Sequence, residues 1–160
     1  MTHPSLGLPP PNLTAGFPDA AKRLRTSRER LAARALEIAI DADASLTDRY
    51  DEVGLRKLLR DAAVLLDRLA LSVAGGDPGW LRDFAEQIPP IYRRRRVPLD
   101  DVIVLLEGIR AASRAVLSPD EMTAADPAID GAINVLRWNR RIAGDARKRN
   151  RILAALYKGA

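Results

Sequence analysis

Apolar residues recur at the three- and four-residue spacing of α-helices along most of the chain. The clearest run lies between residues 53 and 74, where one face carries Leu55, Leu58, Leu59, Ala62, Leu65, Leu66, Leu69 and Val73. This spacing is typical of an amphipathic helix that buries one stripe. Residues 98–117 are apolar around most of the helix circumference, which predicts a helix at the centre of the fold or at a dimer contact. No segment alternates as a half-buried strand does, so we expect an all-α protein.

Proline, glycine and acidic residues divide this pattern into separate helices. A helix is expected from Pro18 to about residue 44, and Gly75-Gly76 ends the helix at 53–74. The Pro89-Pro90 step ends or kinks the helix before it. Further helix starts are expected at Asp77-Pro78, Pro98, Ser118-Pro119 and Asp126-Pro127. These boundaries predict a bundle of about five to six helices, the last of which runs from residue 127 to about residue 157.

The length and the N-terminal composition predict one domain preceded by an arm. At 160 residues the chain is long enough to build one hydrophobic core. Residues 1–17 hold four prolines and little charge, so we expect an extended arm there and a single helical domain over residues 18–160. The arm lacks the features of a signal peptide, and no run approaches the roughly 18 apolar residues of a membrane span. We therefore expect a cytoplasmic protein.

The residue types that carry most enzyme and metal chemistry are missing from the expected domain. The chain has no cysteine, and its one histidine, His3, lies in the arm. These absences exclude cysteine and Ser-His-Asp catalysis, histidine-ligated haem and the usual zinc sites from the domain. The adjacent carboxylates Asp51-Glu52 and Asp100-Asp101 are typical of helix starts, where the helix dipole favours negative charge. We expect a protein that is not an enzyme and that binds no metal or cofactor.

Positive charge is concentrated in three stretches, residues 22–34, 93–96 and 137–158. Two of them supply candidate contacts to an anion or to a partner protein: Arg93, Arg94, Arg95, Arg96, Arg147, Lys148 and Arg149. Guanidinium groups bind phosphates and carboxylates through paired hydrogen bonds. The alternative is a solvated surface, because four successive helical residues point in four directions and the C-terminal run lacks interleaved aromatic residues. This alternative is favoured for both stretches.

Three aromatic residues are candidates for a small apolar pocket: Trp80, Phe84 and Tyr92. Trp80 and Phe84 lie four residues apart, so they share one face of a helix. Aromatic residues at this spacing are more typical of a hydrophobic core, which is the alternative for this pair.

The order of helix ends and starts resembles a known family. Gly76-Asp77-Pro78, Tyr92-Arg93-Arg94 and Leu99-Asp100-Asp101, within residues 53–117, are similar to the N-terminal helical sensor domains of RsbR-type stressosome co-antagonists of the RsbT kinase. The resemblance implies a globin-like or orthogonal multi-helix bundle without haem, which dimerises and passes a signal along its last helix. Relatives of this type continue into a STAS domain, whereas this chain ends at Ala160, which implies a free-standing module. The resemblance transfers no site residue.

Together these features predict a non-enzymatic, haem-less bacterial signalling or sensor module in a stress response. We expect it to form a homodimer and to act through contacts with a protein partner, with surplus apolar surface on residues 98–117 and 127–157 buried in the dimer. Two alternatives remain. The basic stretches are compatible with a nucleic-acid-associated protein, which is not favoured. An apolar cavity between helices is compatible with a carrier of small apolar ligands.

Overall fold

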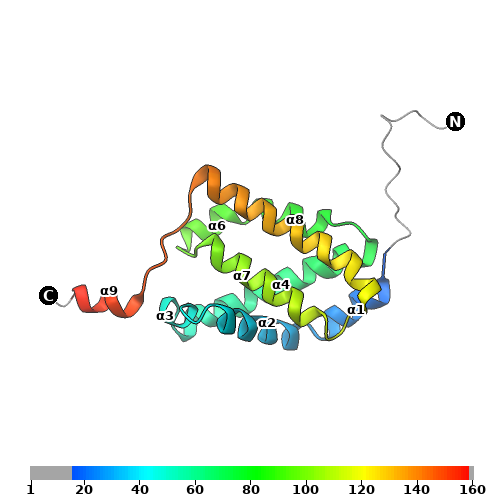
Figure 1. The fold of residues 1–160 in the computed structure, drawn as a ribbon, viewed down its shortest axis with the longest axis horizontal. Coiled ribbons are helices and arrows are strands. Elements are labelled where there is room, and N and C mark those ends of the chain that lie inside the picture. Colours follow the sequence, from blue (N-terminus) through cyan, green and yellow to red (C-terminus); the bar gives the residue numbers. More distant parts are fainter. Residues whose placement is uncertain (1–15, 159–160) are drawn as a thin grey trace.

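The computed structural model describes residues 16–158, and the regular structure within this range is entirely helical (Figure 1). In chain order the helices are α1 (Pro18–Thr26), α2 (Arg28–Ala42), α3 (Leu46–Arg49), α4 (Glu52–Gly75), α5 (Gly79–Gln87), α6 (Pro89–Arg94), α7 (Leu99–Ser113), α8 (Pro119–Ala143) and α9 (Arg151–Lys158). The prediction of an all-α protein is confirmed. The helices outnumber those expected, because short helices form at α3 and α6 and two long segments are interrupted.

Both interruptions fall inside segments that the apolar spacing predicts as single helices. The segment that begins at Pro18 is interrupted at Ser27, where α1 ends and α2 begins. The C-terminal segment is interrupted at Gly144, whose φ of 74° ends α8 before the separate helix α9. Glycine adopts this left-handed conformation without the steric cost that a Cβ imposes. The expected helix over residues 127–157 is therefore wrong at its C-terminal half.

The predicted start of the last long helix, at Asp126-Pro127, is also wrong. α8 begins at Pro119, not at Pro127, which lies inside the helix. Ser118 and Glu121 form a capping box in which each side chain binds the other residue's main-chain amide. Pro127 removes one main-chain hydrogen bond from the interior of α8. The buried residues on both sides of it keep the helix continuous, because they are packed against the rest of the bundle.

The helix α7 lies at the centre of the bundle, between α2 and α8, with α4 behind it (Figure 1). Its apolar residues are buried on most sides by these three helices. Gly108 lets α7 approach α2 closely, since a Cβ at this position would lie 2.3 Å from the Ala35 carbonyl oxygen. The central position predicted for residues 98–117 is confirmed. Val104, Ala111 and Val116 in this segment stay partly exposed, so the dimer contact expected there stays a prediction.

The helix α4 buries the leucine stripe that its spacing predicts. Leu58, Leu65, Leu66 and Leu69 are each at most 2% exposed. Its N-terminus is capped by Asp51, whose side chain accepts the Gly54 amide at 2.8 Å. Its C-terminus ends at Gly76 in the left-handed conformation, as the Gly-Gly pair indicates.

No helix among residues 16–158 is long and apolar enough to cross a membrane. The arm expected over residues 1–17 lies almost wholly outside the described residues. The segment 144–150 leads from α8 to α9, which lies beyond the bundle at the C-terminal end and close to α3 (Figure 1).

Candidate functional site

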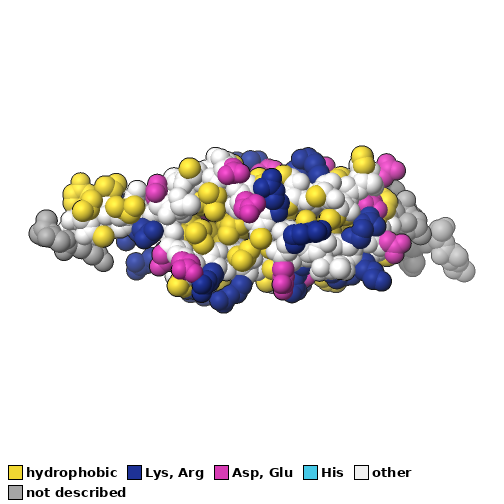
Figure 2. All heavy atoms as spheres, turned by 90° about the horizontal axis from the view of Figure 1, so that it is seen from below, with side chains coloured by type: hydrophobic (Ala, Val, Ile, Leu, Met, Phe, Trp, Pro, Cys, Tyr) yellow, Lys and Arg dark blue, Asp and Glu magenta, His cyan; other side chains and the backbone are white. Residues whose placement is uncertain are grey.

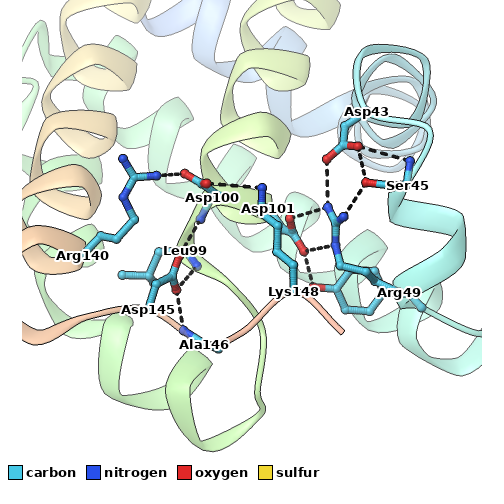
Figure 3. A network of polar contacts seen from close by, with 11 residues as sticks. Asp43, Ser45, Arg49, Leu99, Asp100, Asp101, Arg140, Asp145, Ala146 and Lys148 are labelled. Carbon is cyan, nitrogen blue, oxygen red and sulfur yellow. Dashed lines mark hydrogen bonds and ion pairs between the residues drawn. The ribbon is translucent and has the colours of Figure 1, made fainter. Parts of the chain in front are cut away.

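A buried carboxylate holds the first turn of α7 to α3 at one end of the bundle. Asp101 is 2% exposed, and its two oxygens accept from Arg49 Nε at 3.1 Å and Nη2 at 2.7 Å (Figure 3). The Tyr50 hydroxyl donates to Asp101 Oδ2 at 2.6 Å, and Arg49 also donates to Asp43 Oδ2 at 2.8 Å. The planar guanidinium group therefore joins two carboxylates. Each charge in this poorly solvated position has a partner of opposite sign.

This network changes the pKa values of its members. Hydrogen bonds from Ser45 and Arg49 lower the pKa of Asp43 to about 2. Burial, together with the hydrogen bond to Asp101 and its charge, raises the pKa of Tyr50 far above the usual range. Burial lowers the pKa of Arg49, but the hydrogen bonds to Asp101 and Asp43 outweigh it and raise the pKa overall. At neutral pH Asp43 and Arg49 are charged and Tyr50 is a neutral donor.

The low pKa of Asp43 predicts an acid-dependent contribution to stability. Because the folded pKa lies below the ordinary value of 3.8, the charged carboxylate stabilises the fold above about pH 4 and loses this effect as the pH falls towards about 2. We expect Asp43→Asn to lower the free energy of unfolding by about 1 kcal/mol at about pH 6, since solvent screens this partly exposed group. The difference from the unmodified protein should shrink at about pH 3 in urea unfolding. A constant difference across this range would contradict the assignment.

A second set of contacts attaches the segment 144–150 to the N-terminus of α7. Asp145 accepts the Leu99 amide at 2.6 Å and the Asp100 amide at 3.4 Å, so it caps α7 from a distant part of the sequence (Figure 3). Asp100 forms ion pairs with Arg140 and, at 3.3 Å, with Lys148. Asp100, like its neighbour in the buried network, is therefore held by cations at the start of α7.

The structure separates the four consecutive arginines into different environments. Arg95 forms an ion pair with Asp61 at 2.9 Å, and its guanidinium lies 5.0 Å from the centre of the buried Tyr92 ring. Arg94 is exposed and takes part in no ion pair with another described residue. Arg93 and Arg96 line a pocket. The four side chains therefore do not share one environment, but Arg93 and Arg96 line the same pocket.

This pocket, which we call the arginine pocket, has a volume of about 390 Å³. Its lining residues come from α3, from the end of α6 and from the segment 144–150: Arg49, Tyr50, Arg93, Arg96, Pro98, Ala146, Arg147 and Arg149. The fold thereby brings together four of the seven basic residues that the sequence marks as candidates. Arg94, Arg95 and Lys148 do not line it.

Sequence reasoning missed Arg49 and Tyr50. Both lie in or directly after α3, a helix of 4 residues that no apolar periodicity marks. Their partner Asp101 is 52 residues from Arg49 along the chain, so no local spacing relates them. The available signal was the pair Asp100-Asp101 at the start of a very apolar helix, which marks a position where a carboxylate lies close to the core.

The aromatic candidates are divided between two places. Trp80 and Phe84 line a shallow pocket of about 310 Å³ with a partly charged rim, and Arg68 lies 4.9 Å from the centre of the Phe84 ring. Trp80 is 51% exposed, so this residue is not in the hydrophobic core. Tyr92 does not line this pocket and is buried beside Asp61. The three aromatic residues therefore do not form one apolar pocket.

A comparison with known protein families identifies the family of this chain. The sequence model of the phycobilisome protein family matches residues 13–136, which include α1 to α7 and most of α8. The chain belongs to the phycobilisome protein family. No curated protein matches the chain.

Membership of the phycobilisome family corrects the functional prediction. The resemblance to RsbR-type sensor domains is wrong, and so are the signalling, sensor and stress-response roles that followed from it. The globin-like fold class is confirmed, because phycobilisome proteins have a globin-like helical fold. The prediction that the protein is not an enzyme is confirmed as well, since phycobilisome proteins are light-harvesting structural proteins. Members of the family oligomerise with one another, and the expected signalling-pathway partner is not supported.

The pigment associated with the family is a bilin, and the side chains of this chain do not fit a covalently attached one. A thioether bond to a bilin requires the nucleophilic sulfur of a cysteine. None of the 160 residues is a cysteine. The 160 residues therefore hold no thioether-linked bilin.

Proposed function

We propose that this protein is an unpigmented assembly subunit of the phycobilisome family, which contributes protein–protein contacts in place of a covalently bound chromophore. The observation that carries this proposal is the absence of cysteine from a chain that matches the family over most of its length. Assembly is the property of the family that requires no pigment on this chain. The proposal includes self-association as a homodimer and a cytoplasmic location, in keeping with phycobilisomes as complexes at the thylakoid surface.

The C-terminal helix α9 is the contact surface that best supports this proposal. Ile152, Leu153, Leu156 and Tyr157 are each more than half exposed. Figure 2 shows hydrophobic atoms gathered at the α9 end of the molecule, away from the bundle. Large apolar side chains gathered on one surface mark an interaction site in proteins that assemble. Since members of the family associate with one another, a second copy of this chain is the partner to which α9 is assigned.

We expect the full chain, produced in cells that supply a bilin, to sediment as an oligomer without visible absorbance. Leu153→Glu with Leu156→Glu should shift it to the monomer, because the charges would have to be buried in the contact. Sedimentation velocity with detection at 280 nm and at visible wavelengths measures both properties at once. A matched control is Ala154→Glu with Ala155→Glu, which adds the same charge to the opposite face of α9 and should leave the oligomer intact.

Two results would contradict this function. The first is a monomer at protein concentrations on the order of 100 µM, where even a weak dimer forms. The second is visible absorbance that sediments with the protein in equimolar amount, which would show that the chain carries a pigment without a thioether bond.

A further inference from the structure

The arginine pocket holds positive charge that the described part of the chain does not neutralise. Arg93, Arg96, Arg147 and Arg149 line it, and none of them forms an ion pair with a residue in the range 16–158. The charge of Arg49, which also lines the pocket, is matched by its two carboxylates. Four converging guanidinium groups repel one another unless an anion lies between them.

Four carboxylates of the surrounding segments are engaged with other groups. Asp43 and Asp101 bind Arg49, and Asp100 binds Arg140 and Lys148. Asp145 accepts main-chain amides at the start of α7 and the Ala146 amide. None of these side chains forms an ion pair with the four arginines, so the lining stays strongly positive.

Arg93 has a side-chain donor that the described residues leave without a partner. Its Nε atom is buried and has no hydrogen-bond partner among the described residues. Only Nη2 is engaged, through a contact of 3.4 Å with the Asn139 carbonyl oxygen. A buried donor on a charged group is costly when it is unpaired, and such groups are nearly always satisfied by protein, water or ligand.

Arg96 adds backbone strain at the same place. Its φ is 58°, and no other non-glycine residue in the described range has a positive φ. The conformation is held by the Arg96 amide, which donates to the Arg93 carbonyl at 3.1 Å, and by the Val97 amide, which donates to the Tyr92 carbonyl at 2.9 Å. These hydrogen bonds form the cap of the α6 C-terminus, so the end of this helix fixes where Arg96 leaves the main chain.

The shape of the pocket indicates a small molecule as its ligand. A volume of about 390 Å³ lies within the range of small-molecule sites and exceeds that of a single phosphate ion. Tyr50, Pro98 and Ala146 supply an apolar part of the lining. Arginine forks pair best with oxyanions that offer two oxygens in one plane, as phosphate and carboxylate groups do.

We propose that the arginine pocket binds a small, multiply charged phosphate compound through Arg93, Arg96, Arg147 and Arg149. Arg93 and Arg96 line the pocket from the last turn of α6 and the residues directly after it. The segment 144–150 brings in the remaining two arginines, because Asp145 and Lys148 attach it to α7. This site is independent of self-association through α9, so either property can fail without the other.

The test uses inorganic pyrophosphate as the probe and the full chain as the protein. Isothermal titration at low salt should show saturable binding with one site per chain. Arg93→Gln and Arg96→Gly should each weaken it by about tenfold or more, since each removes a charged hydrogen-bond donor. Glycine at position 96 also relieves the positive φ, so the melting temperature of the free Arg96→Gly protein should be unchanged or higher. This variant separates loss of binding from loss of folding.

The matched control is Arg94→Gln, which removes the same charge from the same run of arginines outside the pocket. It should bind pyrophosphate as the unmodified protein does. Equal weakening in Arg94→Gln would show a general charge effect and overturn the proposal, as would the absence of binding at about 1 mM pyrophosphate in low salt. Binding to anionic lipid vesicles or to a DNA oligonucleotide without binding to pyrophosphate would also overturn it, because the ligand would then be a macromolecular or membrane surface.

Discussion

Replacement of Asp101 by asparagine is expected to lower the free energy of unfolding by about 3 kcal/mol. The change removes the negative charge that two donors of Arg49 and the Tyr50 hydroxyl share. Arg49, whose side chain is 7% exposed, would keep Asp43 as its only carboxylate partner among the described residues. Removing one partner of a buried ion pair lowers stability by more than the intact pair contributes to it, since the remaining charge stays buried without a partner. Urea unfolding followed by circular dichroism at neutral pH measures the effect.

The adjacent residue provides the control for this prediction. Asp100 has the same side chain and begins the same helix, but its ion pairs with Arg140 and Lys148 lie at the surface. Asp100→Asn should therefore cost less than about 1 kcal/mol, as exposed ion pairs generally do. If the two variants lost equal stability, burial of the Asp101 network would not be the cause. Hydrogen exchange should also show faster opening of α3 in Asp101→Asn only.

Replacement of Gly108 by alanine is expected to lower the free energy of unfolding by about 3 kcal/mol, although alanine favours helix more than glycine does. A Cβ at this position would lie 2.3 Å from the Ala35 carbonyl oxygen, a main-chain atom of α2. Main-chain atoms inside a helix cannot move alone, so α2 and α7 must separate and leave gaps on both sides. Urea or thermal unfolding measures the loss.

Gly131 is the matched control, because it is also a glycine inside a long helix. There the nearest atoms to an added Cβ belong to the Arg82 side chain, at 3.6 Å or more, which is ordinary contact. Gly131→Ala should raise the free energy of unfolding by up to about 1 kcal/mol through helix propensity. A stabilising effect of Gly108→Ala of the same size would show that α2 and α7 adjust freely.

The functional prediction failed because the residues that suggested it describe helix ends. Gly76-Asp77-Pro78 ends α4 and begins α5, and Leu99-Asp100-Asp101 begins α7. Such residues recur wherever one helix stops and another starts, so they carry little information on ancestry. The family match instead extends over residues 13–136, most of the chain. The globin-like fold that the resemblance implied was nevertheless right, since phycobilisome proteins also have a globin-like helical fold.

The candidate site was only partly predictable for a related reason. Local pattern identifies Arg93–Arg96 as unusual. It does not reveal that Arg95 pairs with Asp61, or that Arg96 adopts a positive φ. Ion pairs between residues more than thirty positions apart leave no periodic signal in one sequence. Arg49 in particular has no local feature that distinguishes it from a surface arginine.

The helical class, the leucine stripe of α4, the burial of α7 and the absence of a thioether-linked pigment could all be predicted from local sequence. These properties depend on spacing along one helix or on the presence of a residue type, and both are local. The ends of α8, the arginines that share a pocket and the carboxylate buried beneath them became visible in the folded chain. Those properties depend on contacts between α3, α6, α7 and the segment 144–150, and such contacts form only after distant segments have packed together.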